Sequence, residues 1–170
     1  MPEYADLITK IVARGREWYI VKQHIARMGP SDTVWHTRSY KDARREERAL
    51  DRGARKLFKD IVQRWLAENG FEDTNVQTQA CFHLPGMSTG YPPRQFPLGF
   101  GLHQVAIHNA KHAVQPRYKW LNKIVVSGGG IIQTDPRART DPLFTWAMAE
   151  KFAAFTQEVQ DALRAAFAGR

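Results

Sequence analysis

Hydrophobic residues in the N-terminal part of the chain follow two different patterns. Residues 3–14 place aliphatic side chains three and four positions apart, as on one face of an α-helix. These side chains are Leu7, Ile8, Ile11 and Val12. Residues 17–27 and 33–40 are instead rich in β-branched and aromatic side chains, and the turn-forming residues 29–32 separate them. The second pattern predicts a β-hairpin, and a single kinked helix through Met28 is the alternative interpretation.

Residues 40–69 form the longest periodic segment and predict an α-helix. Their apolar positions fall on one stripe when successive residues are placed about 100° apart. The stripe consists of Leu50, Ala54, Leu57, Phe58, Ile61 and Trp65. Ser39 and Asp42 resemble a capping box with a shorter acid, and the Asn-Gly pair at 69–70 gives a helix stop. Gly53 lies inside this helix at a cost of about 1 kcal/mol, which suggests close packing there.

The C-terminal half carries further strand signals and one more helix signal. Residues 75–84 and 102–110 have the composition of strands. Residues 119–126 and 131–134 flank three glycines that lack the Lys and Ser/Thr of a phosphate-binding loop, so they predict a second hairpin. The Asp-Pro pair at 141–142 is a suitable start for a final helix. Its apolar face comprises Phe144, Met148, Phe152, Phe155, Val159, Leu163 and Phe167.

Residues 85–101 predict a long loop, because they contain four prolines and four glycines. The loop also carries Tyr91, Arg94, Phe96 and Phe100. Aromatic side chains beside an arginine can stack on unpaired bases, but loop phenylalanines more often pack beneath the loop. Residues 86–90 match the G-x-S-x-G of a hydrolase nucleophile elbow. We interpret this match as chance, since the prolines at 92–93 prevent the helix that the motif requires.

The order of these elements is helix, two strands, helix, four strands and helix, which is typical of an α+β protein. We expect a mostly antiparallel sheet built from hairpins and packed against the long helix and the amphipathic C-terminal helix. The length fits a single domain, residues 1–170, and 43% hydrophobic residues suffice for a packed core. Cys81, the only cysteine, excludes an intramolecular disulfide. The absence of a signal-peptide pattern and of a long apolar run favours an intracellular protein without a membrane partner.

Positive charge is the strongest global indication of a partner. The chain has 25 Lys and Arg against 17 Asp and Glu, a formal charge of +8 that favours polyanions. On the helix predicted for residues 40–69, one sector gathers cations that could contact successive phosphates. The sector comprises Arg44, Arg48, Arg52, Arg55, Lys56 and Lys59, with Lys41 and Arg45 at its edge. The alternative is a solvated face with local ion pairs, such as Asp51 with Arg55.

Glu47 projects onto the apolar stripe of the same helix, between Ala43 and Leu50 in angle. A carboxylate that is half-buried needs a cationic partner or a functional reason for its position. Glu47 is therefore a candidate general base or metal ligand. We favour the competing interpretation, an ion pair with an arginine from a strand, because structural ion pairs are common.

Three of the six histidines, His103, His108 and His112, lie within residues 102–112. His103 and His108 are five positions apart, so they face opposite sides of one strand. The one set that could hold zinc combines Cys81, His83, His108 and His112. It lacks the usual C-x₂-C spacing, so we favour ordinary strand or surface histidines and predict no cofactor.

These patterns favour a protein that binds DNA or RNA through the basic sector of residues 41–60. The candidate contacts are Arg44, Arg45, Arg48, Arg52, Arg55, Lys56 and Lys59, with Arg94 as a secondary contact. One alternative is a structural subunit of a larger assembly, such as a virion or a homo-oligomer, with residues 85–101 and the C-terminal helix as contacts. The other is a metal-dependent nuclease that uses the histidine cluster His103, His108 and His112 with Glu47. The sequence does not decide whether the protein is an enzyme.

Overall fold

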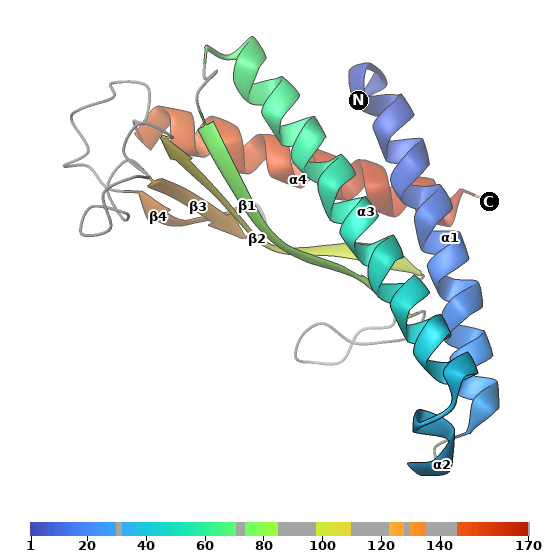
Figure 1. The fold of residues 1–170 in the computed structure, drawn as a ribbon. Helices are drawn as coiled ribbons and strands as arrows, with labels where there is room; N and C mark the ends of the chain where they lie inside the picture. Colours follow the sequence, from blue (N-terminus) through green and yellow to red (C-terminus); the bar gives the residue numbers. More distant parts are fainter. Residues whose placement is uncertain are drawn as a thin grey trace, which may run out of the picture. The chain divides into compact units, whose positions relative to one another are not determined.

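The structure is a computed structural model that describes residues 1–29, 32–70, 74–84, 98–109, 123–127, 130–134 and 146–169. Helices and strands follow one another as a 3₁₀ turn, three helices, four strands and a final helix (Figure 1). They are η1 (Pro2–Tyr4), α1 (Ala5–Met28), α2 (Asp32–Trp35), α3 (Arg38–Glu68), β1 (Thr74–His83), β2 (Gly99–Asn109), β3 (Lys123–Ser127), β4 (Gly130–Thr134) and α4 (Trp146–Ala168). This content confirms the predicted α+β class. Among the described residues, no helix is long and apolar enough to cross a membrane.

The chain divides into two compact units, each with its own interior. The unit that we call the sheet unit contains Met1, Lys59–Ala80 and Gly101–Ala162. The unit that we call the helical unit contains Pro2–Phe58, Cys81–Phe100 and Leu163–Arg170. Helices α3 and α4 and strands β1 and β2 each contribute to both. The organisation as a single domain stays a prediction.

The four strands form one sheet in the order β1-β2-β3-β4 (Figure 1). β2 pairs antiparallel with β3, and β3 pairs antiparallel with β4, where Ser127 lies opposite Gly130. This pairing confirms the hairpin predicted around the triple glycine. In β2 and β3, successive residues such as Val105, Ala106 and Ile107 are buried, so both faces of these strands are covered.

Aromatic contacts join the end of α3 to α4 within the sheet unit. The Trp65 ring stacks on Phe155 with centroids 4.7 Å apart and lies 5.8 Å from the Phe152 ring. The Lys151 ammonium donates a hydrogen bond to the side-chain oxygen of Asn69, at the end of α3. The predicted apolar faces of both helices therefore meet here in one core.

The prediction of strands at residues 17–27 and 33–40 is wrong, because α1 runs without interruption to Met28 and is followed by α2 and α3. The buried side of α1 explains the difference. Its buried residues recur every three or four positions along the whole helix: Leu7, Ile8, Ile11, Val12, Gly15, Trp18 and Val21. Tertiary burial of this face overrides the weaker β propensity of residues 17–27.

α1 and α3 lie side by side and antiparallel in the helical unit (Figure 1). The Lys22 ammonium of α1 contacts Glu47 of α3. About two helix turns away along α1, the Arg14 side chain lies against Gly53 of α3. This approach confirms that Gly53 is a site of close packing. The absence of a side chain there leaves room for the Arg14 guanidinium.

The start of α3 differs from the prediction and its end agrees with it. Thr37, not Ser39, caps the helix: its hydroxyl accepts a hydrogen bond from the Tyr40 N–H at 3.3 Å. The predicted capping box with Asp42 is therefore wrong by two residues. At the other end, Gly70 has a φ of +88°, a conformation that favours glycine, and terminates the helix as expected.

Phe82 of β1 is at the centre of an aromatic cluster in the helical unit. Its ring lies 5.6 Å from Trp18, 5.1 Å from Phe100 and 6.4 Å from Phe167. Phe100 is only 4% exposed, so this aromatic belongs to the core and is not available to stack on bases. Other predictions for the proline-rich segment and for the start of the last helix lie outside the described residues: Tyr91, Arg94, Phe96, the G-x-S-x-G match and the pair at 141–142.

Gly15 allows this cluster to form, and we expect Gly15→Ala to destabilise the protein. A Cβ at this position would lie 2.7 Å from the Phe167 ring and 2.9 Å from the Phe82 ring. Overpacking of a core costs about 1–3 kcal/mol, which exceeds the gain of about 1 kcal/mol from replacing a helical glycine with alanine. Urea denaturation should show a lower free energy of unfolding, by about 1 kcal/mol.

Gly53→Ala is the matched control in α3. Its Cβ would lie 2.8 Å from Arg14 Nε, near the end of a flexible side chain that can move aside. The free energy of unfolding should therefore stay unchanged or rise by up to about 1 kcal/mol. Equal losses in both variants would contradict the packing assigned to Gly15.

Candidate nucleic-acid interface

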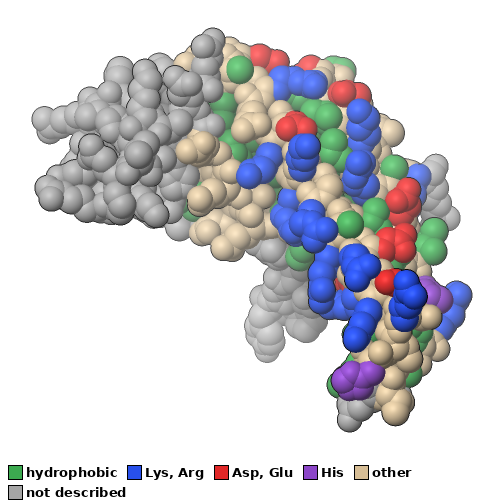
Figure 2. Space-filling view, in the orientation of Figure 1, with side chains coloured by type: hydrophobic (Ala, Val, Ile, Leu, Met, Phe, Trp, Pro, Cys, Tyr) green, Lys and Arg blue, Asp and Glu red, His purple; other side chains and the backbone are tan. Residues whose placement is uncertain are grey.

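The predicted basic sector lies on α3, and we call its eight cations the basic face. They are Lys41, Arg44, Arg45, Arg48, Arg52, Arg55, Lys56 and Lys59. Lys41, Arg45, Arg48, Arg52 and Lys56 are exposed, and the other three are partly buried. Lysine and arginine side chains gather along α3 on the visible side of the molecule (Figure 2). Lys59 belongs to the sheet unit, so the first seven cations form the part of the basic face within the helical unit.

Some of these cations have carboxylate partners and others do not. Arg44 pairs with Glu47, and the Arg45 guanidinium lies 3.5 Å from Asp42. Arg55 lies close enough to Asp51 for its charge to oppose part of the rise that burial causes in the pKa of that carboxyl. Across the described ranges, Lys41, Arg48, Arg52 and Lys56 form no ion pair with a carboxylate. Local pairs therefore neutralise only part of the basic face.

A concave surface lies over the first half of the basic face. It encloses about 450 Å³ and is lined by Tyr40 together with five cations: Lys41, Arg44, Arg45, Arg48 and Arg52. We call it the basic concavity. A hollow lined by charges of one sign concentrates their field, so it attracts anions more strongly than the same charges on a convex surface.

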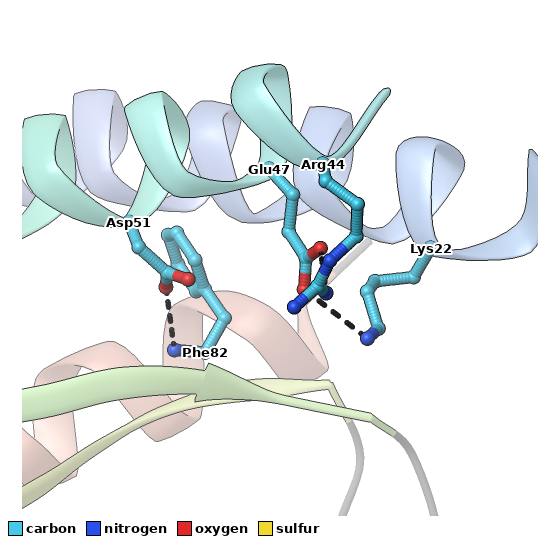
Figure 3. Close-up of polar contacts among 5 residues, drawn as sticks. All are labelled: Lys22, Arg44, Glu47, Asp51 and Phe82. Carbon is cyan, nitrogen blue, oxygen red and sulfur yellow. Dashed lines mark hydrogen bonds and ion pairs between the residues drawn. The ribbon is translucent and has the colours of Figure 1, made fainter. Parts of the chain in front are cut away.

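Glu47 is buried in the helical unit, with 7% of its surface exposed. One carboxylate oxygen lies 3.1 Å from the Lys22 ammonium of α1, and the other accepts a hydrogen bond from Arg44 (Figure 3). The expectation of a cationic partner is thus confirmed, whereas the partner's origin in a strand is wrong: both cations come from helices. Burial and two cationic partners leave this carboxylate little access to a substrate, so the arrangement favours a structural role.

Asp51 is the carboxylate whose role sequence patterns did not reveal. It lies on the same side of α3 as Glu47 and accepts a hydrogen bond from the Phe82 N–H at 3.2 Å (Figure 3). Among the described strands β1 lies at the edge of the sheet, and Asp51 supplies an acceptor for a backbone N–H of this strand. Burial raises the pKa of Asp51, although the Phe82 N–H and Arg55 oppose the shift. The same environment, burial first and then the Asp51 charge, raises the pKa of the Cys81 thiol.

The zinc set predicted from the sequence falls only partly within the described residues. Cys81 and His83 are half-buried on β1, and the His83 imidazole lies against Gly99 of the neighbouring strand, where a Cβ would approach it to 2.7 Å. The backbones of His103 and His108 belong to β2, but their side chains, and all of His112, lie outside the described residues. Among the side chains that are described, no three His, Cys, Asp or Glu residues form a metal-binding group. The described residues therefore test neither the zinc hypothesis nor the prediction of no cofactor.

Removing both cations that hold Glu47 should destabilise the protein strongly. In Lys22→Met/Arg44→Met the carboxylate is left buried without a partner, and such losses cost about 3–5 kcal/mol. Both cations are partly exposed, at 25% and 33%, so we expect about 3 kcal/mol in chemical denaturation. Adding Glu47→Leu should restore most of the loss, because it removes the unpaired charge.

Arg45→Met is the control for this set of variants. Its partner Asp42 is 56% exposed, so the pair should contribute less than about 1 kcal/mol. A triple variant no more stable than the double variant would contradict the account of Glu47 as a buried ion-paired carboxylate.

Asp51→Asn should change how stability depends on pH. The raised pKa means that the folded state binds the Asp51 proton more tightly than the unfolded state does. The contribution of this tighter proton binding to the free energy of unfolding is full below the ordinary pKa of 3.8. It is lost as the pH rises through the higher pKa of the folded state. The wild type should therefore gain stability relative to Asp51→Asn as the pH falls through this window, while an Asn oxygen can still accept the Phe82 hydrogen bond. If the difference in free energy of unfolding between the wild type and Asp51→Asn stays constant with pH, or changes in the opposite direction, Asp51 is not desolvated.

The chain matches no protein-family model, and searches of curated proteins and of solved structures also gave no match. The residues of this chain are therefore the basis for inferring a function. Its strongest feature is the set of exposed cations on α3 around the basic concavity.

Proposed function

We propose that this protein binds nucleic acid through the basic face of α3. The observation that carries the proposal is the group of exposed cations without carboxylate partners among the described residues: Lys41, Arg48, Arg52 and Lys56. Unpaired surface cations in a row are costly to keep close together unless an anion compensates their mutual repulsion. A polyphosphate backbone supplies that compensation at regular intervals.

The spacing along the helix supports a polymeric partner. Steps of three and four residues separate Lys41, Arg45, Arg48, Arg52 and Lys56, and each residue of an α-helix rises by about 1.5 Å. The cations therefore follow one another at intervals of about 5–6 Å over a length of about 22 Å. A small anion could occupy one part of this row, whereas an extended polyanion can contact all of it. The net positive charge of the whole chain adds long-range attraction for such a polyanion.

The other two hypotheses have less support from the described residues. The nuclease hypothesis used Glu47 as a catalytic group, and Glu47 is enclosed by Lys22 and Arg44. The assembly hypothesis depends in part on residues 85–101, most of which lie outside the described residues. We therefore place nucleic-acid binding first.

Neutralising three cations of the basic face should weaken binding and reduce its dependence on salt. Arg48→Gln/Arg52→Gln/Lys56→Gln removes exposed charges and leaves the pair of Arg44 with buried Glu47 intact. Each lost phosphate contact lowers the slope of log K against log salt concentration by about 0.7–0.9. Fluorescence anisotropy with a labelled oligonucleotide should therefore give weaker binding and a slope smaller by about 2–3.

Lys10→Gln/Arg16→Gln/Arg27→Gln is the matched control, because it removes the same number of exposed charges from α1. It should change affinity much less than the α3 variant. Equal losses in both would mean that net charge, not the basic face, determines binding, and no binding by the wild type at low salt would refute the proposed function.

A further inference from the structure

Tyr40 and Trp35 bring aromatic side chains to the same end of the basic face. Tyr40 lines the basic concavity together with Lys41, Arg44 and three further arginines. Trp35, in α2, is 48% exposed, and two residues later Thr37 caps α3. Within the described part of the chain, neither ring packs against another aromatic ring. Exposure of a large aromatic residue has a cost in water, which a stacking partner would remove.

The charges across α3 favour one phosphate backbone over two. The cations occupy the outward ridge of the helix, with acidic residues on one side of it: Asp42 and Glu46 are both exposed. A helix in the major groove of a duplex has a phosphate backbone on each side and base edges in front of its ridge. In that position the acidic side would face phosphates. A single strand that follows the ridge meets only the cations.

Tyr40 lies away from Asp42 and Glu46 and shares its angle on α3 with buried Phe58. Tyr40 is near the start of the helix, where it is only half-buried and lines the basic concavity. A strand with its phosphates on Arg45, Arg48 and Arg52 can therefore turn its bases away from the acidic residues and toward the Tyr40 ring. Aromatic stacking beside a cationic track is how proteins bind single strands without reading a sequence. The bases of a duplex are already stacked and paired, so they cannot use such a ring.

We propose that the basic concavity binds single-stranded nucleic acid with a base stacked on Tyr40, and that exposed Trp35, five positions earlier in the chain, offers a second stacking position. This inference rests on the proposed function and adds its substrate class. The cations bind the backbone of any strand, and the two aromatic rings discriminate a strand with free bases from a duplex.

The test compares three probes of equal length at one salt concentration: an oligothymidylate, the corresponding abasic oligomer and a blunt duplex. The wild type should bind the oligothymidylate about tenfold or more tightly than either of the others. Tyr40→Leu should remove most of this preference, because it should weaken binding of the oligothymidylate far more than binding of the abasic oligomer. Tyr40→Phe retains the ring and should behave as the wild type does. Trp35→Leu, with Trp35→Phe as its control, should lower the preference by a smaller factor.

The outcomes separate the two proposals. If none of the three probes binds at low salt, both the proposed function and this inference are overturned. If all three bind equally well, or the duplex binds best, the inference fails and nucleic-acid binding stands. If Tyr40→Leu unfolds the protein, the comparison of the oligothymidylate with the abasic oligomer on the wild type still decides whether bases contribute.

Discussion

Ala54 and Phe58 of α3 are fully buried, and their burial determines where every other side chain of this helix can lie. A helix is rigid over this length, so a buried side on one sector forces the remaining sectors outward. The sector that faces solvent is the one with the cations. In the part of the chain that the structure describes, Arg48, Arg52 and Lys56 form no ion pair with a carboxylate and lie outside the apolar core, because the geometry of the helix turns them toward solvent.

Glu47 and Asp51 are the charged exceptions on or near the buried side, and each has a distinct physical compensation. Glu47 is held by Lys22 and Arg44, and its pair with Lys22 joins α1 to α3. Asp51 accepts the hydrogen bond of the Phe82 N–H on β1, the strand at one edge of the sheet that the described strands form. One helix thus holds α1, protects a sheet edge and presents the basic face, and a change in its register would disturb all three.

Sequence patterns predicted the parts of this fold that depend on strong local signals. The periodicity of α3, its stop at Gly70 and the hairpin of β3 and β4 are of this kind, as are the cations that share one sector of α3. Residues 17–27 were misassigned because their composition favours strands, whereas the side of α1 that they continue is buried at helical spacing. The partners of Glu47, the role of Asp51 and the place of Tyr40 in the basic concavity depend on contacts between distant residues, which no local pattern encodes.

An NMR titration with an oligothymidylate tests most directly whether the basic face of α3 binds nucleic acid. The titration is followed by the side-chain Nε–Hε signals of the arginines. Each arginine reports its own environment, and a chain of 19.5 kDa is suitable for the method. We predict that the signals of Arg45, Arg48 and Arg52 shift together as the oligonucleotide is added, while those of Arg16 and Arg27 on α1 stay in place. Shifts concentrated on the α1 arginines, or none at low salt, would contradict the assignment of the basic face as the binding surface.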